Sequence, residues 1–180
     1  MFDEKMHPLV LEALEFATWA HGSIKQLRKY TGEPYITHPI AVAEIVKLAP
    51  HTPEMLAAAL LHDVREDVLV PRYVILRVFG PIVDEYVDWL TEVSTKADGV
   101  RSLRKAKDRD RLALAPHQVQ TIKLGDIIHN TISVVANDPK FSRVYLPEMV
   151  DLLSVLTKGD PHLHTIATET VMHNLKNILT

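Results

Sequence analysis

The amino-acid sequence predicts an all-α fold, and two features carry this prediction. Apolar residues recur at spacings of three and four along most of the 180 residues, and no stretch keeps the strict alternation that is typical of a β-strand. Hydrophobic residues make up 47% of the chain and charged residues 24%, which is the balance of a globular protein with a core. Because this length is usual for a single core, we expect one domain over residues 1–180.

The first half of the chain is expected to hold five helices. Apolar spacing predicts the first helix from about Val10 to His21-Gly22, with Trp19 and later Trp89 in the core. Thr37, followed by Pro39, indicates the start of the second helix with Thr37 as its N-cap. The expected ranges of the second to fifth helices are 37–49, 53–70, 72–79 and 82–93.

The second half begins with a charge-dense segment, residues 96–111, which contains the run SLRKAKDRDR. We expect a mobile loop that leads into a short helix, and two interpretations of its charge stay open. It is either a solvated helix face or a basic surface that receives a polyphosphate. Apolar spacing and the positions of proline predict the remaining helices at 116–137, 143–157 and 162–179, with Pro147 as an alternative start of the second of these.

Charge and composition exclude several classes of function. The net charge of −3 provides no general attraction for nucleic acid or for an anionic membrane. No apolar run approaches the roughly 20 residues that span a bilayer. The chain has no cysteine, which fits a cytoplasmic protein and leaves only nitrogen and oxygen ligands for any metal.

The stretch ALLHDVRED places four potential metal ligands or bases directly after an apolar run. On a continuous helix, His62 lies one turn from Glu66, and Asp63 lies one turn from Asp67, so the four side chains share one side. A solvated acidic face is the alternative interpretation of this stretch.

Two distant residues favour a metal site. Asp126 lies in an apolar helix, where a buried carboxylate needs a positive partner, either a basic side chain or a metal ion. His38 lies at a helix start, where the helix dipole favours the neutral ring that binds metals. His38, His62, Asp63 and Asp126 form a set of two histidines and two carboxylates that suits Mn²⁺ better than Fe²⁺ or Zn²⁺.

Three segments follow one another in the order HGSIKQLRKYTGEPYITHP, AALLHDVRED and LAPHQVQTIKLGDIIHN. In these segments the chain resembles the HD-domain hydrolases of the RelA/SpoT type, and specifically the stand-alone small alarmone hydrolases. The resemblance covers the chain from about Ala17 to Leu156. It implies an HD-domain bundle of roughly nine to ten helices, one Mn²⁺ per chain and no synthetase or regulatory domain.

The resemblance also implies roles for single residues. His38, His62, Asp63 and Asp126 would bind the metal, and Glu66 with Asp67 would activate the attacking water. The implied substrate contacts are Arg28, Lys29, Asn130, Tyr145 and, close to the last of these, Arg143. Arg65 departs from the family pattern, because an apolar residue is usual at its position.

The implied function is hydrolysis of (p)ppGpp, with (p)ppApp as a further candidate, to the nucleotide 5′-diphosphate or 5′-triphosphate and pyrophosphate. Two alternatives stay open: a phosphatase acting on a nucleotide 2′- or 3′-monophosphate such as NADPH, and an alarmone-binding protein with little turnover. The expected partner is a small nucleotide, and neither the choice of purine nor the oligomeric state follows from the sequence.

Overall fold

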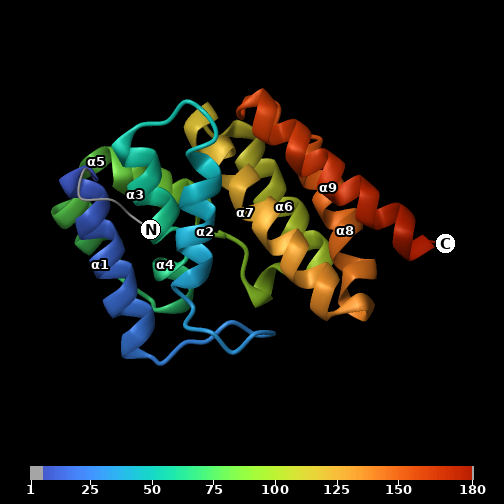
Figure 1. The fold of residues 1–180 in the computed structure, drawn as a ribbon, viewed down its shortest axis with the longest axis horizontal. Coiled ribbons are helices and arrows are strands. Elements are labelled where there is room, and N and C mark those ends of the chain that lie inside the picture. The colour runs from blue at the N-terminus through green and yellow to red at the C-terminus, as the bar shows by residue number, and fades with distance from the viewer. Residues whose placement is uncertain (1–5, 180) are drawn as a thin grey trace. The chain divides into compact units, whose positions relative to one another are not determined.

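The fold is described by a computed structural model that covers residues 6–179. Across residues 6–179 the chain forms nine α-helices, of which α4 is a single turn, and one 3-10 helix. This range contains no strand, and only an isolated antiparallel bridge joins Leu27 to Pro34, so the all-α prediction is confirmed. None of the helices in it has the length and apolar character needed to cross a membrane. The described part of the chain forms two compact units, with the boundary between Thr91 and Glu92 (Figure 1).

The first unit is built around α3. Its helices are α1 (Pro8–Ser23), α2 (Thr37–Val46), α3 (Pro53–Leu61), α4 (Val64–Asp67) and α5 (Arg72–Leu90). The helices α1, α2 and α5 all pack against α3 (Figure 1). Every residue from Met55 to Leu61 is buried, as expected of a helix that other helices enclose. Burial of a single leucine such as Leu60 stabilises the fold by roughly 1.5–3 kcal/mol.

The continuous helix predicted over residues 53–70 is wrong, because the chain breaks at His62 and Asp63. His62 is the C-cap of α3, and α4 begins one residue after Asp63. The His62 ring makes a 2.8 Å hydrogen bond through Nδ1 to the carbonyl oxygen of Ala59. In a continuous helix that oxygen would accept from the backbone N–H of Asp63, so the side chain competes with the helix.

Three other expectations in the first unit differ from the structure. Ile36 is the N-cap of α2, because the Thr37 hydroxyl donates instead to the carbonyl of Pro34 at 3.0 Å. The helices predicted at 72–79 and 82–93 are two arms of α5, which ends at Leu90 and bends at Gly80. Gly80 has φ 84°, which glycine adopts without strain. Trp19 is 66% exposed and therefore not part of the core.

The second unit is built around α7. Its elements are η1 (Lys96–Asp98), α6 (Arg101–Leu114), α7 (His117–Asn137), α8 (Pro139–Leu153) and α9 (Pro161–Leu179). The helices α8 and α9 pack against α7 and against each other, and α6 contacts α8. Buried apolar residues follow α7 from Val119 to Val134, so this helix forms the centre of the unit's core.

Two helices of this unit differ from the sequence-based prediction: α6 is longer, and α8 both begins and ends earlier, at Pro139 and Leu153. The short helix predicted within residues 96–111 is in fact α6, with 14 residues, and it begins at Arg101. The helix predicted to start at Arg143 begins at Pro139, because the Asp138 carboxylate accepts from the backbone N–H of Phe141 at 3.0 Å and caps it. Pro147 therefore lies inside α8 and does not mark its start.

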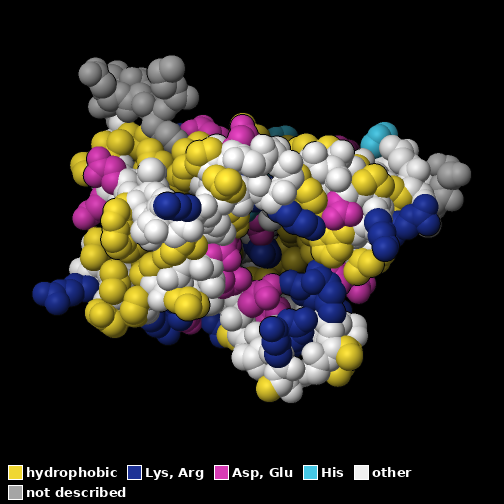
Figure 2. Space-filling view, turned by 90° about the horizontal axis from the view of Figure 1, so that it is seen from below, with side chains coloured by type: hydrophobic (Ala, Val, Ile, Leu, Met, Phe, Trp, Pro, Cys, Tyr) yellow, Lys and Arg dark blue, Asp and Glu magenta, His cyan; other side chains and the backbone are white. Residues whose placement is uncertain are grey.

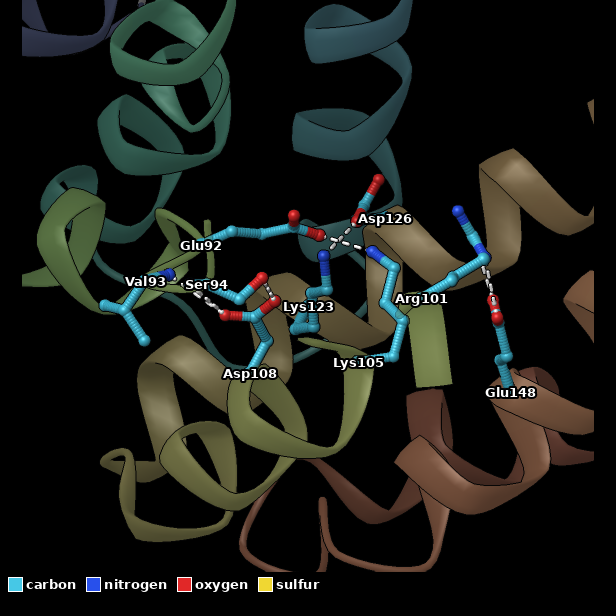
Figure 3. A network of polar contacts seen from close by, with 9 residues as sticks. All are labelled: Glu92, Val93, Ser94, Arg101, Lys105, Asp108, Lys123, Asp126 and Glu148. Atoms are coloured by element: carbon cyan, nitrogen blue, oxygen red, sulfur yellow. Dashed lines mark hydrogen bonds and ion pairs between the residues drawn. The ribbon is translucent and has the colours of Figure 1, made fainter. Parts of the chain in front are cut away.

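A buried carboxylate, Asp108, attaches α6 to the segment before it (Figure 3). Its Oδ1 accepts from the backbone N–H groups of Val93 and Ser94, both at 2.9 Å, and its Oδ2 accepts from the Ser94 hydroxyl at 2.6 Å. Hydrogen bonds to a charged acceptor contribute more than neutral ones, so these three contacts order residues 92–95 and fix α6 beside them.

The loop after α8 is bound closely to α7. The backbone N–H of Lys158 donates to Gln120 Oε1 at 2.8 Å, and that of Asp160 donates to the Thr121 hydroxyl at 2.9 Å. Between them, Gly159 lies so near α7 that a Cβ atom would stand 2.7 Å from Leu124 Cδ1 and 3.3 Å from the carbonyl carbon of Gln120. The absence of a side chain at Gly159 permits this close contact.

We expect Gly159→Ala to lower the free energy of unfolding by about 1–3 kcal/mol, since the new methyl group must displace the fully buried Leu124. Urea unfolding followed by circular dichroism measures the change. Gly22→Ala is the matched control, because no atom lies within 4 Å of the position of its Cβ. Equal stability of Gly159→Ala and the wild type would contradict this account of the loop.

Candidate functional site

In the first unit, His38, His62 and Asp63 come together as the sequence predicts. Asp63 Oδ2 lies 3.0 Å from His62 Nε2 and 3.6 Å from His38 Nε2. The two imidazole rings are 5.1 Å apart between centroids, and a nitrogen of each lies within 4.8 Å of one of the other. Both histidines are buried, with 1% and 4% of their surfaces exposed. Three potential ligand atoms therefore face one point.

The tautomer of His62 suits a cation at this point. A carbonyl oxygen only accepts, so the bond from Nδ1 to Ala59 O places the proton of the neutral ring on Nδ1. Nε2 then presents its lone pair toward the side on which Asp63 Oδ2 lies. A backbone partner for the second nitrogen is the usual arrangement of a metal-binding histidine. The residues present thus fit a divalent metal.

Tyr35 supports this cluster, and it is a residue of the first motif for which the sequence predicts no role. Its hydroxyl donates to Asp63 Oδ2 at 2.6 Å. Its ring packs edge-on against His38 with 5.8 Å between centroids. A donor on a carboxylate that faces two imidazoles holds the carboxylate in one orientation, so Tyr35 orders the cluster from the side.

The acidic pair Glu66 and Asp67 is exposed on α4. The Gln26 side-chain amide donates to Asp67 Oδ2 at 2.8 Å. Arg65, between Val64 and Glu66, reaches α5 and pairs with Asp88 at 2.7 Å. This pair explains the unusual residue at position 65, because it attaches the single turn of α4 to the longer helix.

The basic loop of the first unit is a small hairpin. The N–H of Arg28 donates to Glu33 O at 2.8 Å, and the N–H of Tyr35 donates to Gln26 O at 3.1 Å. The guanidinium of Arg28 lies over the Tyr35 ring, 5.6 Å from its centroid, which brings it next to the cluster. Lys29 instead contacts Tyr30, with its ammonium 4.6 Å from the ring centroid. Arg28 is therefore joined to the metal-site residues through Tyr35.

In the second unit, Asp126 is buried on α7 with 6% of its surface exposed. Lys123 Nζ lies 2.7 Å from its Oδ2 (Figure 3). The side-chain amide of Asn130 donates to Oδ1 at 2.6 Å. The basic partner expected for a buried carboxylate is thus Lys123. Each carboxylate oxygen has two lone pairs, so these contacts leave the capacity to bind a metal as well.

Tyr145 and Arg143, both on α8, have different surroundings. Tyr145 is buried, and its hydroxyl lies 3.4 Å from that of Thr131. Burial raises the pKa of the Tyr145 hydroxyl well above its usual range, so the group keeps its proton at every physiological pH. Arg143 is exposed. Both residues stay predictions as substrate contacts.

The charges of α6 are largely compensated within the second unit. Lys105 pairs with Glu92, and Arg101 pairs with Glu148 at 2.7 Å (Figure 3). Lys107 pairs with Asp98 at 2.7 Å. On the face of the molecule drawn in Figure 2, Lys and Arg side chains lie in a group next to acidic side chains. The pairing favours a solvated helix over a basic surface for polyphosphate.

Comparison with known proteins identifies relatives. The model of the HD domain family matches residues 13–144. A Synechocystis protein named "Probable guanosine-3′,5′-bis(diphosphate) 3′-pyrophosphohydrolase" is 32% identical over 153 residues, which cover 83% of this chain and 20% of the relative. A Brucella suis protein named "GTP pyrophosphokinase rsh" is 35% identical over 141 residues, or 73% of this chain and 18% of the relative. The chain therefore spans about a fifth of the length of these curated relatives.

A solved structure of similar length was also found. It is described as that of a metazoan ortholog of SpoT that hydrolyzes ppGpp, and it superposes with a TM-score of 0.81 and 25% identity. The match covers 96% of this chain and 97% of that one. A second structure, of lmo0812 from Listeria monocytogenes, has a TM-score of 0.66 and 22% identity and supports the fold.

We expect Tyr35→Phe to weaken binding of a divalent metal, with Mn²⁺ as the probe, about 10-fold, because loss of the hydroxyl frees the Asp63 carboxylate to rotate. Isothermal titration calorimetry on metal-free protein measures the change in Kd. Tyr30→Phe, which removes a hydroxyl that Lys29 contacts in the same hairpin, serves as the control. Identical Mn²⁺ affinity in Tyr35→Phe and the wild type would refute a supporting role for Tyr35.

Proposed function

Because the chain belongs to the HD-domain family, we propose that it is a Mn²⁺-dependent pyrophosphohydrolase that removes the 3′-pyrophosphate of (p)ppGpp, with (p)ppApp as a second substrate. The observation that carries the proposal is the convergence of His38, His62 and Asp63 on one point. The cyanobacterial relative is named for this reaction, and the metazoan relative is described as hydrolyzing ppGpp. These descriptions support the choice of substrate.

The proposed metal site consists of four residues. His38, His62 and Asp63 supply two nitrogen ligands and one oxygen ligand, and family membership implies a divalent metal. Asp126 is the proposed fourth ligand, which is supported by its burial and by its place in the third sequence motif. Two imidazoles and two carboxylates make a borderline-hard site, and we therefore propose one Mn²⁺ per chain.

The acidic pair is proposed to perform the proton transfer. A divalent cation held by these residues would lower the pKa of a bound water molecule and would draw charge from phosphoryl oxygens. Glu66 and Asp67 are carboxylates within one turn of Asp63, so they can take the proton of the attacking water. The oxygen of that water bonds to the phosphorus next to the 3′-oxygen. The bond from phosphorus to the 3′-oxygen breaks, so that pyrophosphate carries away the oxygen of the water, and the leaving 3′-oxygen takes up the proton that the acidic pair removed.

The proposed substrate contacts come from the hairpin and from the helices α7 and α8. In the hairpin, Arg28 offers a flat guanidinium for a purine, and Lys29 offers an ammonium for phosphate oxygens. On α7, the Asn130 amide is held toward Asp126, whose ligand role it would support. Tyr145 and Arg143 are further candidates, one as a hydroxyl that stays protonated and the other as a surface cation.

Incubation with ppGpp and with ppApp in the presence of Mn²⁺, followed by separation of all products, tests the proposal. We expect GDP or ADP together with pyrophosphate, no turnover after chelation and recovery when Mn²⁺ is returned. Asp63→Ala should lose both bound metal and activity, whereas Asp151→Ala, at a side chain that is 70% exposed on α8, should keep both. Release of orthophosphate from a 2′- or 3′-monophosphate, or binding without turnover, would contradict the proposal.

Glu66→Gln and Asp67→Asn should each keep the bound metal and lose about 10²-fold or more in kcat, the range expected when a general base is removed. Single-turnover kinetics together with metal analysis separates chemistry from binding. Glu12→Gln, at an exposed position on α1, is the control for loss of a carboxylate. Reduced metal content with normal turnover per bound metal would mean that the pair supports the metal site instead of taking a proton.

A further inference from the structure

A chain of two hydrogen bonds joins the end of α1 to the acidic pair. His21, in the last turn of α1, lies with Nδ1 2.7 Å from Gln26 Oε1. The amide nitrogen of the same Gln26 side chain lies 2.8 Å from Asp67 Oδ2. Gln26 and Asp67 are 41 positions apart in the sequence. All three residues belong to the first unit.

The chemistry of the three groups fixes the direction of both bonds. An ionised carboxylate only accepts, so Gln26 must turn its NH₂ group toward Asp67 and its oxygen toward His21. An oxygen of an amide also only accepts, so His21 carries its proton on Nδ1. His21 is 1% exposed, and its Nε2 is a buried atom without a hydrogen-bond partner among the described residues. A buried position without an acceptor tolerates an unprotonated nitrogen better than an N–H group, so Nε2 carries the lone pair.

The side chain of Gln26 is not required to hold the hairpin in place. The Gln26 backbone already does so, since its N–H donates to His21 O at 3.0 Å and its carbonyl accepts from Tyr35 N–H at 3.1 Å. The partly exposed amide could hydrogen-bond to water at little cost. Its contacts with a buried imidazole and with one member of the acidic pair therefore need a reason other than loop structure.

We propose that Gln26 is a positioning residue for Asp67 and that His21 sets the direction of the Gln26 amide. The inference rests on the proposed function, in which Asp67 takes part in removing a proton from the attacking water. With Oδ2 held by Gln26, Asp67 presents Oδ1 in one orientation for that proton. A fixed orientation of the base raises kcat, since a freely rotating carboxylate points correctly for only part of the time.

The hydrogen-bond chain is tested first without any substrate. Nitrogen NMR of the imidazole groups in metal-free protein, with His21 assigned by the spectrum of His21→Asn, reports which nitrogen carries the proton. We expect the Nδ1–H tautomer of His21 at neutral pH. The Nε2–H tautomer would reverse the Gln26 amide and overturn the inference, whatever the enzyme hydrolyses.

A double-mutant cycle then tests the link to Asp67. Gln26→Met keeps the length of the side chain and removes its donor, and we expect kcat to fall about 10-fold with KM within twofold. The same substitution in Asp67→Asn should change kcat less than twofold, because the group that it positions is already disabled. Equal losses in both backgrounds would overturn the inference and assign Gln26 a structural role.

Two further variants separate positioning from folding. His21→Asn retains a donor near the place of Nδ1 and should keep kcat within about threefold, whereas His21→Leu lacks the donor and should resemble Gln26→Met. Thr31→Ala, which removes hydrogen bonds to Glu33 in the same hairpin, should leave kcat unchanged. A loss as large in His21→Asn as in His21→Leu would overturn the inference. A wild-type chain without turnover would instead reject the proposed function, and the tautomer of His21 would then decide the hydrogen-bond chain alone.

Discussion

The candidate site of the first unit depends on the hydrogen bond between the His62 ring and the carbonyl of Ala59. This bond ends α3, the buried centre of the unit, and it also fixes which nitrogen of His62 bears the lone pair. Directly after this helix end, Asp63 lies with Oδ2 3.6 Å from Nε2 of His38, which belongs to a different helix. One local interaction thereby terminates a helix and selects a tautomer, next to the carboxylate of the cluster.

The sequence could predict the parts of the fold that follow from apolar spacing and proline. The all-α class and the approximate places of most helices belong to this group. The prediction of a continuous helix failed at His62, because the break comes from a hydrogen bond between a side chain and its own helix. Apolar spacing in the sequence does not reveal such a bond. The early start of α8 was missed because Asp138 caps it, while Pro147 is the stronger signal in the sequence.

The same division applies to the candidate site. The motifs single out residues whose chemistry is distinctive, such as His38, His62 and Asp63, and the structure shows that these three meet. The supporting groups Tyr35 and Gln26 are ordinary polar residues of a loop, and only their contacts distinguish them. Arg65 is the opposite case, because its departure from the family pattern is visible in the sequence but its partner Asp88 is not.

The hairpin between α1 and α2 has a consequence for how the protein can change over generations. Its shape is maintained by backbone bonds between residues 26 and 35 and between residues 28 and 33, while the side chain of Lys29 points away from these bonds toward Tyr30. A mutation at position 29 can therefore alter what the loop attracts without disturbing the turn that presents it. Substitutions at positions of this kind can change which ligand binds while the fold and its buried ionisable groups stay intact.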